Sequence, residues 1–143
     1  MWMVDSTKYI EWIRGRQNPT TILRPCVLTG QIATCGVVRV EVIRGAIKPS
    51  VKDELGRLFD AMIEVPISSM VWRRIADTAW ALDRKDNLLP VADLIIAGCA
   101  RHIGAAVVTL DPHFSQIPGL DVQTDLPKLP PDLTGSAFPF APA

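Results

Sequence analysis

The sequence predicts an α/β domain in which helices cover both faces of a mainly parallel sheet. Short apolar runs of strand length alternate with longer stretches of helical periodicity along most of the chain, an order typical of parallel sheets with crossover helices. The length of 143 residues suits a single hydrophobic core. Two of the apolar runs, at residues 2–4 and 106–109, end next to an acidic residue. Because ligands of such sheets bind at the carboxyl ends of the strands, these two ends are the first candidates for a functional site.

The first third of the chain is expected to contain two strands and three helices. Ser6 or Thr7 caps the first helix, and Gly15 suits a left-handed cap at its other end. Pro25 breaks or starts the second helix. In chain order the expected elements are a strand at 2–4, a helix up to residue 15, a helix at 20–28, a weak strand at 31–35 and a helix at 36–47.

The remaining elements are again short strands and longer helices. Pro66 restricts its segment to an edge strand or a connection. Ser68 or Ser69 caps a long amphipathic helix that ends at Asn87, and Pro90 begins the next helix. In chain order we expect a helix at 51–62, the edge segment at 64–67, the long amphipathic helix, a helix from residue 91, a strand at 106–109 and a short strand at 120–122.

The end of the chain differs in composition from the rest. Residues 127–143 contain five prolines, so a regular helix or strand is not expected there. The folded domain is therefore predicted to cover residues 1–126, with an irregular Pro-rich tail after it.

Composition limits the class of protein and its surroundings. Fifteen basic residues balance fifteen acidic ones, which argues against nonspecific nucleic-acid binding through net charge but leaves room for a local basic patch. The three cysteines follow no metal-binding spacing, and their odd number favours free thiols in a reducing compartment. The sequence begins without a secretory signal pattern and contains no apolar run long enough to cross a bilayer. A cytoplasmic protein without membrane contact is expected.

Four acidic residues interrupt apolar stretches of the sequence, and a carboxylate in such a place requires a physical explanation. Asp5 follows the first strand, Glu41 lies within a helix, Asp93 opens another helix, and Asp111 follows the strand at 106–109. A carboxylate in apolar surroundings must be protonated, paired or bound to a cation. Hard divalent cations such as Mg²⁺ take carboxylate oxygens, and the bound ion can then hold a phosphate and activate water. The four acids therefore predict a metal site.

The same residues carry a resemblance to a known family. The segments Val4-Asp5-Ser6, Val40-Glu41 followed by Gly45, 92–97 (ADLIIA) and 108–114 (VTLDPHF) stand in the order and spacing of the PIN-domain family. Within that family the chain most resembles the toxin components of bacterial VapBC toxin–antitoxin pairs. The resemblance runs from about residue 4 to residue 122, and it implies a PIN-like three-layer α/β/α fold.

The resemblance also implies an activity and a site. PIN toxins are metal-dependent endoribonucleases that use Mg²⁺ or Mn²⁺, are often dimeric, and are inhibited by a small antitoxin protein. Their reaction is an in-line attack on the RNA phosphodiester that leaves a 5′-phosphate and a 3′-hydroxyl. Carried over by position, Asp5 and Asp93 would hold the main metal, and Glu41 and Asp111 would complete its shell or bind a second ion. The neighbouring hydroxyl positions of the family are matched by Ser6 and Thr109.

Two positions depart from the family pattern. Asn87 replaces a common glycine but can adopt a positive φ, and Leu110 replaces a frequent basic residue. The candidate RNA contacts are Arg39, Arg44 and Arg101. The departures affect substrate preference rather than the acids.

Each acid also has a simpler explanation. Asp5 and Asp93 are suited to cap helices, Asp111 to open a turn, and Glu41 to pair with a neighbouring arginine, Arg39 or Arg44. His102 and His113 are expected to be surface or packing residues rather than ligands. The four tryptophans, at positions 2, 12, 72 and 80, are expected in the core or in an interface.

Three functions stay open at this level. The first is the metal-dependent ribonuclease, controlled by an antitoxin and dimeric through an aromatic-rich helical surface. The second is a catalytically inactive module of the same fold that binds RNA or protein. The third is a related metal-dependent phosphatase or DNA nuclease.

Overall fold

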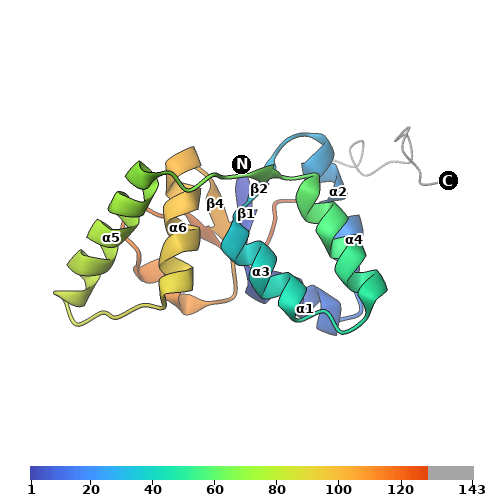
Figure 1. Ribbon diagram of the computed structural model, residues 1–143, viewed down its shortest axis with the longest axis horizontal. Coiled ribbons are helices and arrows are strands. Elements are labelled where there is room, and N and C mark those ends of the chain that lie inside the picture. Colours follow the sequence, from blue (N-terminus) through green and yellow to red (C-terminus); the bar gives the residue numbers. More distant parts are fainter. Residues whose placement is uncertain (129–143) are drawn as a thin grey trace.

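The computed structural model describes residues 1–128, which form one five-stranded sheet between two groups of helices (Figure 1). Helices α1 to α4 lie on one side of the sheet, and α5 and α6 lie on the other. The elements are β1 Trp2–Val4, α1 Ser6–Arg14, α2 Pro19–Leu28, β2 Ile32–Thr34, α3 Gly36–Arg44, α4 Pro49–Asp60, β3 Ile63–Glu64, α5 Ser69–Asp83, α6 Val91–Ile103, β4 Ala106–Val108, the 3₁₀ helix η1 Pro112–Gln116, and β5 Val122–Gln123.

All strand pairs are parallel, and the strand order is β3-β2-β1-β4-β5. The predicted α/β/α architecture is therefore confirmed, including the edge position of β3. The first strand lies at the centre, and its Val4 is in register with Val108 of β4. Asp5, directly after Val4, donates its backbone N–H to Val108 O at 2.9 Å. The register thus brings the ends of β1 and β4, which are about a hundred residues apart in the chain, side by side.

Two details of the predicted helix ends are wrong because the backbone turns at other residues. Helix α1 ends at Gly15 as predicted, but Gly15 has φ −77° and is not left-handed, whereas Arg16 has φ 58°. The long helix α5 ends at Asp83 rather than Asn87, and the positive φ of the following turn, 55°, belongs to Asp86. A short polar side chain tolerates this conformation, which is why Asp86 can make the turn without glycine.

Two other boundaries follow from proline and capping chemistry. Helix α2 begins at Pro19, with Asn18 accepting a hydrogen bond from Thr20 N, and Pro25 lies inside the helix rather than at its start. Helix α3 ends at Arg44, so Ile47 is 97% exposed instead of lying on a buried helical face. The N-cap prediction at Ser68 is confirmed by its side-chain bond from Val71 N.

The core lies between the sheet and both helical layers. Its largest fully buried side chains come from strands and helices throughout the fold, and include Met3, Tyr9, Phe59, Phe114 and Ile96. The three cysteines are buried and free, as predicted. Of the tryptophans, Trp12 belongs to this core and Trp2 packs against it. Among the described helices none combines the length and apolar character that a membrane span requires.

Helix α6 packs unusually closely against α5. A Cβ added at Gly98 would lie 2.3 Å from Ile75 Cγ1, a distance at which the Ile75 side chain or one of the two helices must shift. Glycine at this position therefore permits the close contact between α5 and α6, the helix that carries Asp93.

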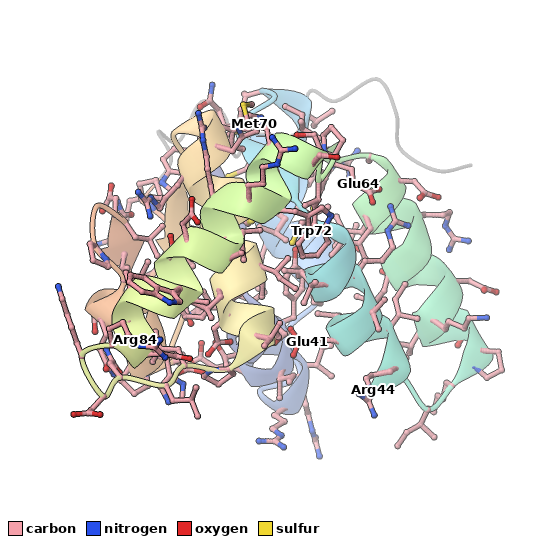
Figure 2. All side chains as sticks on the ribbon, turned by 60° about the vertical axis from the view of Figure 1, so that its left-hand side comes forward. Glu41, Arg44, Glu64, Met70, Trp72 and Arg84 are labelled. Atoms are coloured by element: carbon pink, nitrogen blue, oxygen red, sulfur yellow. The ribbon has the colours of Figure 1, made fainter. Side chains whose placement is uncertain are left out.

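The exposed side of α5 is rich in large apolar side chains. Met70 is 49% exposed, Trp72 46% and Trp80 64%. Figure 2 shows Met70 and Trp72 near one end of the helix and Arg84 at the other. The guanidinium carbon of Arg84 lies 5.3 Å from the centre of the Trp80 ring. Trp72 and Trp80 are therefore not core residues, and their role in an interface stays a prediction.

Candidate metal centre

Asp5 stands at the carboxyl end of β1, where the chain turns into α1. Its side chain caps α1, accepting from Thr7 N, so the helix-cap interpretation is correct. The residue is only 2% exposed. Its Oδ2 atom also accepts hydrogen bonds from Thr7 Oγ1 at 2.8 Å and Thr109 Oγ1 at 2.9 Å, and Ser6 Oγ lies 3.4 Å from Oδ1. These contacts fix the orientation of the buried carboxylate.

The two threonines connect the ends of β1 and β4. Their hydroxyl oxygens are 3.2 Å apart, and each also accepts a backbone hydrogen bond: Leu110 N donates to Thr7 Oγ1 at 3.1 Å, and Asp111 N to Thr109 Oγ1 at 2.9 Å. Thr109 was predicted as a supporting residue. The sequence predicts Ser6 or Thr7 as the cap of α1, but Asp5 holds that position and both residues lie in the first turn of the helix. The contact of the Thr7 hydroxyl with Asp5 is not predicted by the sequence.

Asp93 lies in the first turn of α6 and is 8% exposed. It is not the helix cap, because that position is held by Pro90 without a side-chain bond. The predicted cap role is therefore wrong. The pKa of Asp93 is raised to about 6, chiefly by burial and then by the charges of Asp111, Asp5 and Glu41, whereas the charge of His113 lowers it. Since each of these charges acts on the Asp93 carboxyl, the four acids share one electrostatic site.

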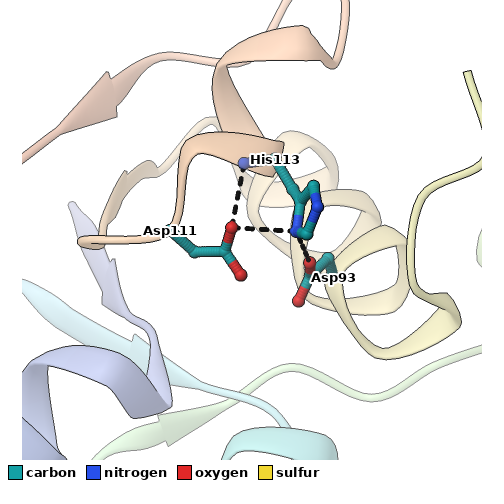
Figure 3. Close-up of side chains that lie close together, drawn as sticks. All are labelled: Asp93, Asp111 and His113. Carbon is teal, nitrogen blue, oxygen red and sulfur yellow. Dashed lines mark hydrogen bonds and ion pairs between the residues drawn. The ribbon is translucent and has the colours of Figure 1, made fainter.

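Asp111 and His113 face Asp93 from the opposite side of the site (Figure 3). Asp111 caps η1 by accepting a hydrogen bond from His113 N at 2.9 Å, so the turn interpretation is correct. His113 Nδ1 lies 2.9 Å from Asp111 Oδ1 and 3.2 Å from Asp93 Oδ2. His102, in contrast, is exposed in the last turn of α6. The structure thus places one of the two histidines, expected at the surface or in packing, within the acidic site.

Glu41 reaches the site from the middle of α3, where it is half-buried. Its Oε1 atom is buried without a hydrogen-bond partner. Burial and then the Asp5 charge raise the pKa of Glu41, whereas Ser6 and Arg44 lower it. Arg39 is not its partner, because that guanidinium pairs with Asp60 at 2.8 Å and Glu64 at 3.2 Å. The predicted pairing with Arg39 is therefore wrong.

The donor set fits a divalent cation. The ligand atoms of Asp93, Asp111 and His113 lie within 4.8 Å of one another, a spacing that one ion can bridge. Glu41 Oε1 and Asp93 Oδ2 are buried oxygens without a hydrogen bond, and such atoms are costly unless a ligand satisfies them. Carboxylate oxygens with one imidazole nitrogen suit a hard or borderline divalent ion. The arrangement can therefore hold a cation next to an open surface.

An apolar groove runs beside the acidic site. It has a volume of about 530 Å³ and lies among α1, α3 and α4. Glu41 lines it together with Ile10, Ile13, Ile47 and Leu55. One wall is thus acidic and shared with the metal centre, while most of the others are aliphatic.

Comparisons with known proteins agree with this architecture. The family model of the PIN domain matches residues 2–120. Among solved structures, VapBC2 from Rickettsia felis bound to a promoter DNA fragment has a TM-score of 0.69 at 20% identity, and DNA-bound VapBC from Salmonella typhimurium has 0.67 at 22%. VapBC-1 from nontypeable Haemophilus influenzae has 0.69 at 18%. Each match covers 85% of this chain and 96% of the other.

No curated protein matches this sequence closely enough to count as a relative. The identities to the solved structures are low, and these structures support the fold alone. The family match, however, covers most of the chain, including all four acids and both threonines. The chain belongs to the PIN domain family.

Proposed function

We propose that this protein is a Mg²⁺-dependent endoribonuclease that hydrolyses RNA phosphodiester bonds, and that it is the VapC-like toxin of a toxin–antitoxin pair in the cytoplasm. The observation that carries the proposal is the convergence of four acids at one end of the sheet, two of which have buried oxygens without a hydrogen bond. Membership of a nuclease family supports the reaction class. The RNA substrate, the Mg²⁺ and the location are our inferences.

The four acids are proposed to have different roles in metal binding, because their surroundings differ. Asp5 and Asp93 hold the main cation, and Glu41 and Asp111 complete its shell or bind a second ion. A bound divalent cation lowers the pKa of water and neutralises charge on phosphoryl oxygens. Thr7 and Thr109 keep the Asp5 carboxylate in one orientation through the hydrogen bonds described above. Glu41 Oε1, which has no partner, is free to accept a proton or hydrogen bond from the attacking water.

RNA contacts are proposed to come from exposed arginines near the acids. Arg44 lies close enough to lower the pKa of Glu41 through its charge, and it lies on α3 with Glu41 (Figure 2). Arg39 is engaged by two carboxylates, and Arg101 lies about two turns of α6 beyond Asp93. Of the three candidates, Arg44 is therefore the best placed to hold a phosphate beside the site.

The proposed partners are an antitoxin and a second copy of the chain. The similar solved structures are VapBC assemblies by name, and VapBC is a family of toxin–antitoxin systems. The apolar groove beside Glu41 suits an apolar segment of an antitoxin, because Ile10, Ile13 and Ile47 expose aliphatic surface there. Met70 and Trp72 on α5 offer an apolar face for a homodimer.

Substitution of the acids tests the activity. Asp93→Asn and Asp5→Asn are expected to lower RNA cleavage roughly 10²- to 10³-fold or more, because each removes charge from the proposed cation site. The matched control is Asp121→Asn, an exposed acid outside the site. Cleavage is measured with Mg²⁺ and with a chelator on RNA, DNA and a phosphomonoester. Undiminished cleavage in both variants contradicts the proposal.

Two further outcomes separate the rival functions. Metal-independent RNA binding without turnover at any Mg²⁺ concentration assigns the protein to the inactive binding modules. Preferential hydrolysis of DNA or of the phosphomonoester assigns it to the related nucleases or phosphatases. Turnover of RNA that depends on Mg²⁺ or Mn²⁺ supports the ribonuclease.

A further inference from the structure

We propose that His113 Nδ1 is a direct ligand of the cation and that it shifts the preference of the site from Mg²⁺ towards Mn²⁺ and other transition ions. The inference deepens the proposed function, since it rests on the same cation site, but it does not depend on RNA being the substrate. Its starting point is that His113, Asp93 and Asp111 each place a ligand atom within 4.8 Å of the others, with His113 Nδ1 in contact with both carboxylates (Figure 3).

The surroundings of His113 Nδ1 are those of a metal ligand, because the nitrogen and the two neighbouring carboxylate oxygens lie around a common point. The nitrogen is buried although the His113 side chain as a whole is 41% exposed. It lies 2.9 Å and 3.2 Å from the two carboxylate oxygens, yet neither contact has the direction of a hydrogen bond. Asp93 Oδ2 is left without a hydrogen bond by the same geometry. A cation among the three atoms satisfies all of them at once.

The backbone holds the imidazole in this place. Asp111 caps η1, and His113 N donates to Asp111 Oδ1, so the same carboxylate contacts both the backbone and the ring of His113. Pro112 occupies the first position of η1, and Phe114 is fully buried in the core. The histidine therefore lies between two anchored residues. A ligand fixed in this way loses little conformational freedom when the ion binds.

The chemistry of the ligands determines the preferred ion. Mg²⁺ requires near-octahedral oxygen coordination and keeps several waters. An imidazole nitrogen is a better ligand for Mn²⁺, and still better for later transition ions, than for Mg²⁺. A site made only of Asp5, Glu41, Asp93 and Asp111 would suit Mg²⁺. Adding His113 makes it a mixed oxygen and nitrogen site.

Pulsed electron paramagnetic resonance of the Mn²⁺-loaded protein tests this coordination directly. Wild type is expected to show a coordinated ¹⁴N coupling that is replaced by a ¹⁵N coupling when histidine is isotopically labelled. The chain has only two histidines, so His102→Gln is a matched control that retains the signal. His113→Gln is expected to lose it. The labelled wild type gives the answer even where the variant folds poorly.

Affinity measurements supply the second readout. By calorimetry with the metals alone, His113→Gln is expected to lower Mn²⁺ affinity about 10-fold or more and Mg²⁺ affinity less than about 3-fold. Mn²⁺ bound without a nitrogen coupling in wild type overturns the inference, as does an equal loss of both affinities in His113→Gln. If wild type shows the nitrogen coupling but cleaves no RNA, the proposed ribonuclease activity fails while the ligand assignment stands.

Discussion

The two sides of the acidic site are both buried but differ in their hydrogen bonds. Asp5 is 2% exposed, and its Oδ2 accepts two hydroxyl hydrogen bonds. Asp93 is 8% exposed, but its Oδ2 has no hydrogen bond, and burial together with the neighbouring acids raises its pKa to about 6. Burial alone therefore does not determine whether a carboxylate oxygen has a hydrogen-bond partner.

The Asp5 side of the site is held in place by hydrogen bonds, whereas the Asp93 side has a buried oxygen that lacks a partner. The threonine hydroxyls stabilise Asp5 in the absence of any ion, so this side can orient a ligand before it binds. Asp93 and Glu41 keep an unfavourable energy that a cation relieves, because a ligand that binds only the folded state stabilises it. The proposed cation site would thus have one half organised by folding and another completed by binding.

The largest change in the free energy of unfolding is expected from Asp93→Asn, measured in the absence of divalent cations. The pKa of Asp93 is raised from 3.8 to about 6, so the folded wild type binds this proton more tightly than the unfolded chain does. Wild type therefore loses stability relative to Asp93→Asn as the pH rises from about 4 to about 6. Two pKa units correspond to about 3 kcal/mol in favour of the variant above pH 6.

Urea unfolding of both proteins at pH 4, 5, 6 and 7.5 measures this difference. Asp121→Asn, which lies outside the site, is the control and should follow wild type at every pH. A constant difference between Asp93→Asn and wild type over this range would contradict the pH dependence. Asp93 would then not be the strained carboxylate of the site.

A smaller effect of opposite sign on the free energy of unfolding is expected from a substitution beside Asp5, whose carboxylate has hydrogen-bond partners. Thr109→Val keeps the shape of the side chain but removes the hydroxyl that donates to Asp5 and accepts from Asp111 N. We expect a loss of about 1–3 kcal/mol in the free energy of unfolding, since buried partners are left unsatisfied. Thr78→Val is the control, because its exposed hydroxyl bonds only Arg74 O within α5. Equal losses of stability in Thr109→Val and Thr78→Val would contradict the claim that the Thr109 hydroxyl stabilises the Asp5 side of the site.

The smallest effect is expected outside the acids. Arg44→Ala should raise the KM for RNA about 3- to 10-fold with little change in kcat, because one phosphate contact is lost. Arg101→Ala is the matched control, and the salt dependence of KM should weaken only in Arg44→Ala. A lower kcat with unchanged KM would assign Arg44 to the site itself rather than to RNA binding.

The fold and the gathering of the four acids at one end of the sheet could be predicted from the sequence because their signals are local, whereas the role of these acids as ligands stays a prediction. Each acid interrupts an apolar run, and Asp5 and Asp111 follow strands whose carboxyl ends lie at the same edge of a parallel sheet. The family resemblance then supplied the order of the motifs. Thr109 could be predicted in the same way, since it is the residue directly after β4.

The residues that were missed depend on contacts between distant segments. Thr7 bonds Thr109 only because β1 and β4 are in register, and no local pattern shows this. His113 reaches Asp93 because η1 is a tight 3₁₀ turn rather than a loop. Arg39 is occupied by Asp60 at the end of α4 and Glu64 of β3. In all three cases the partner lies on another element.

The close contact between Gly98 and Ile75 gives the metal centre a mechanical dependence on a residue without a functional group. Asp93 lies five residues before Gly98 on the same helix, so a side chain at Gly98 that forces α6 away from α5 also displaces Asp93 relative to Asp111. A change at this position would therefore disturb the proposed metal site without altering any of its acidic residues. Natural variation at Gly98 and Ile75 is a route by which the activity proposed for this protein changes while the four acids stay intact.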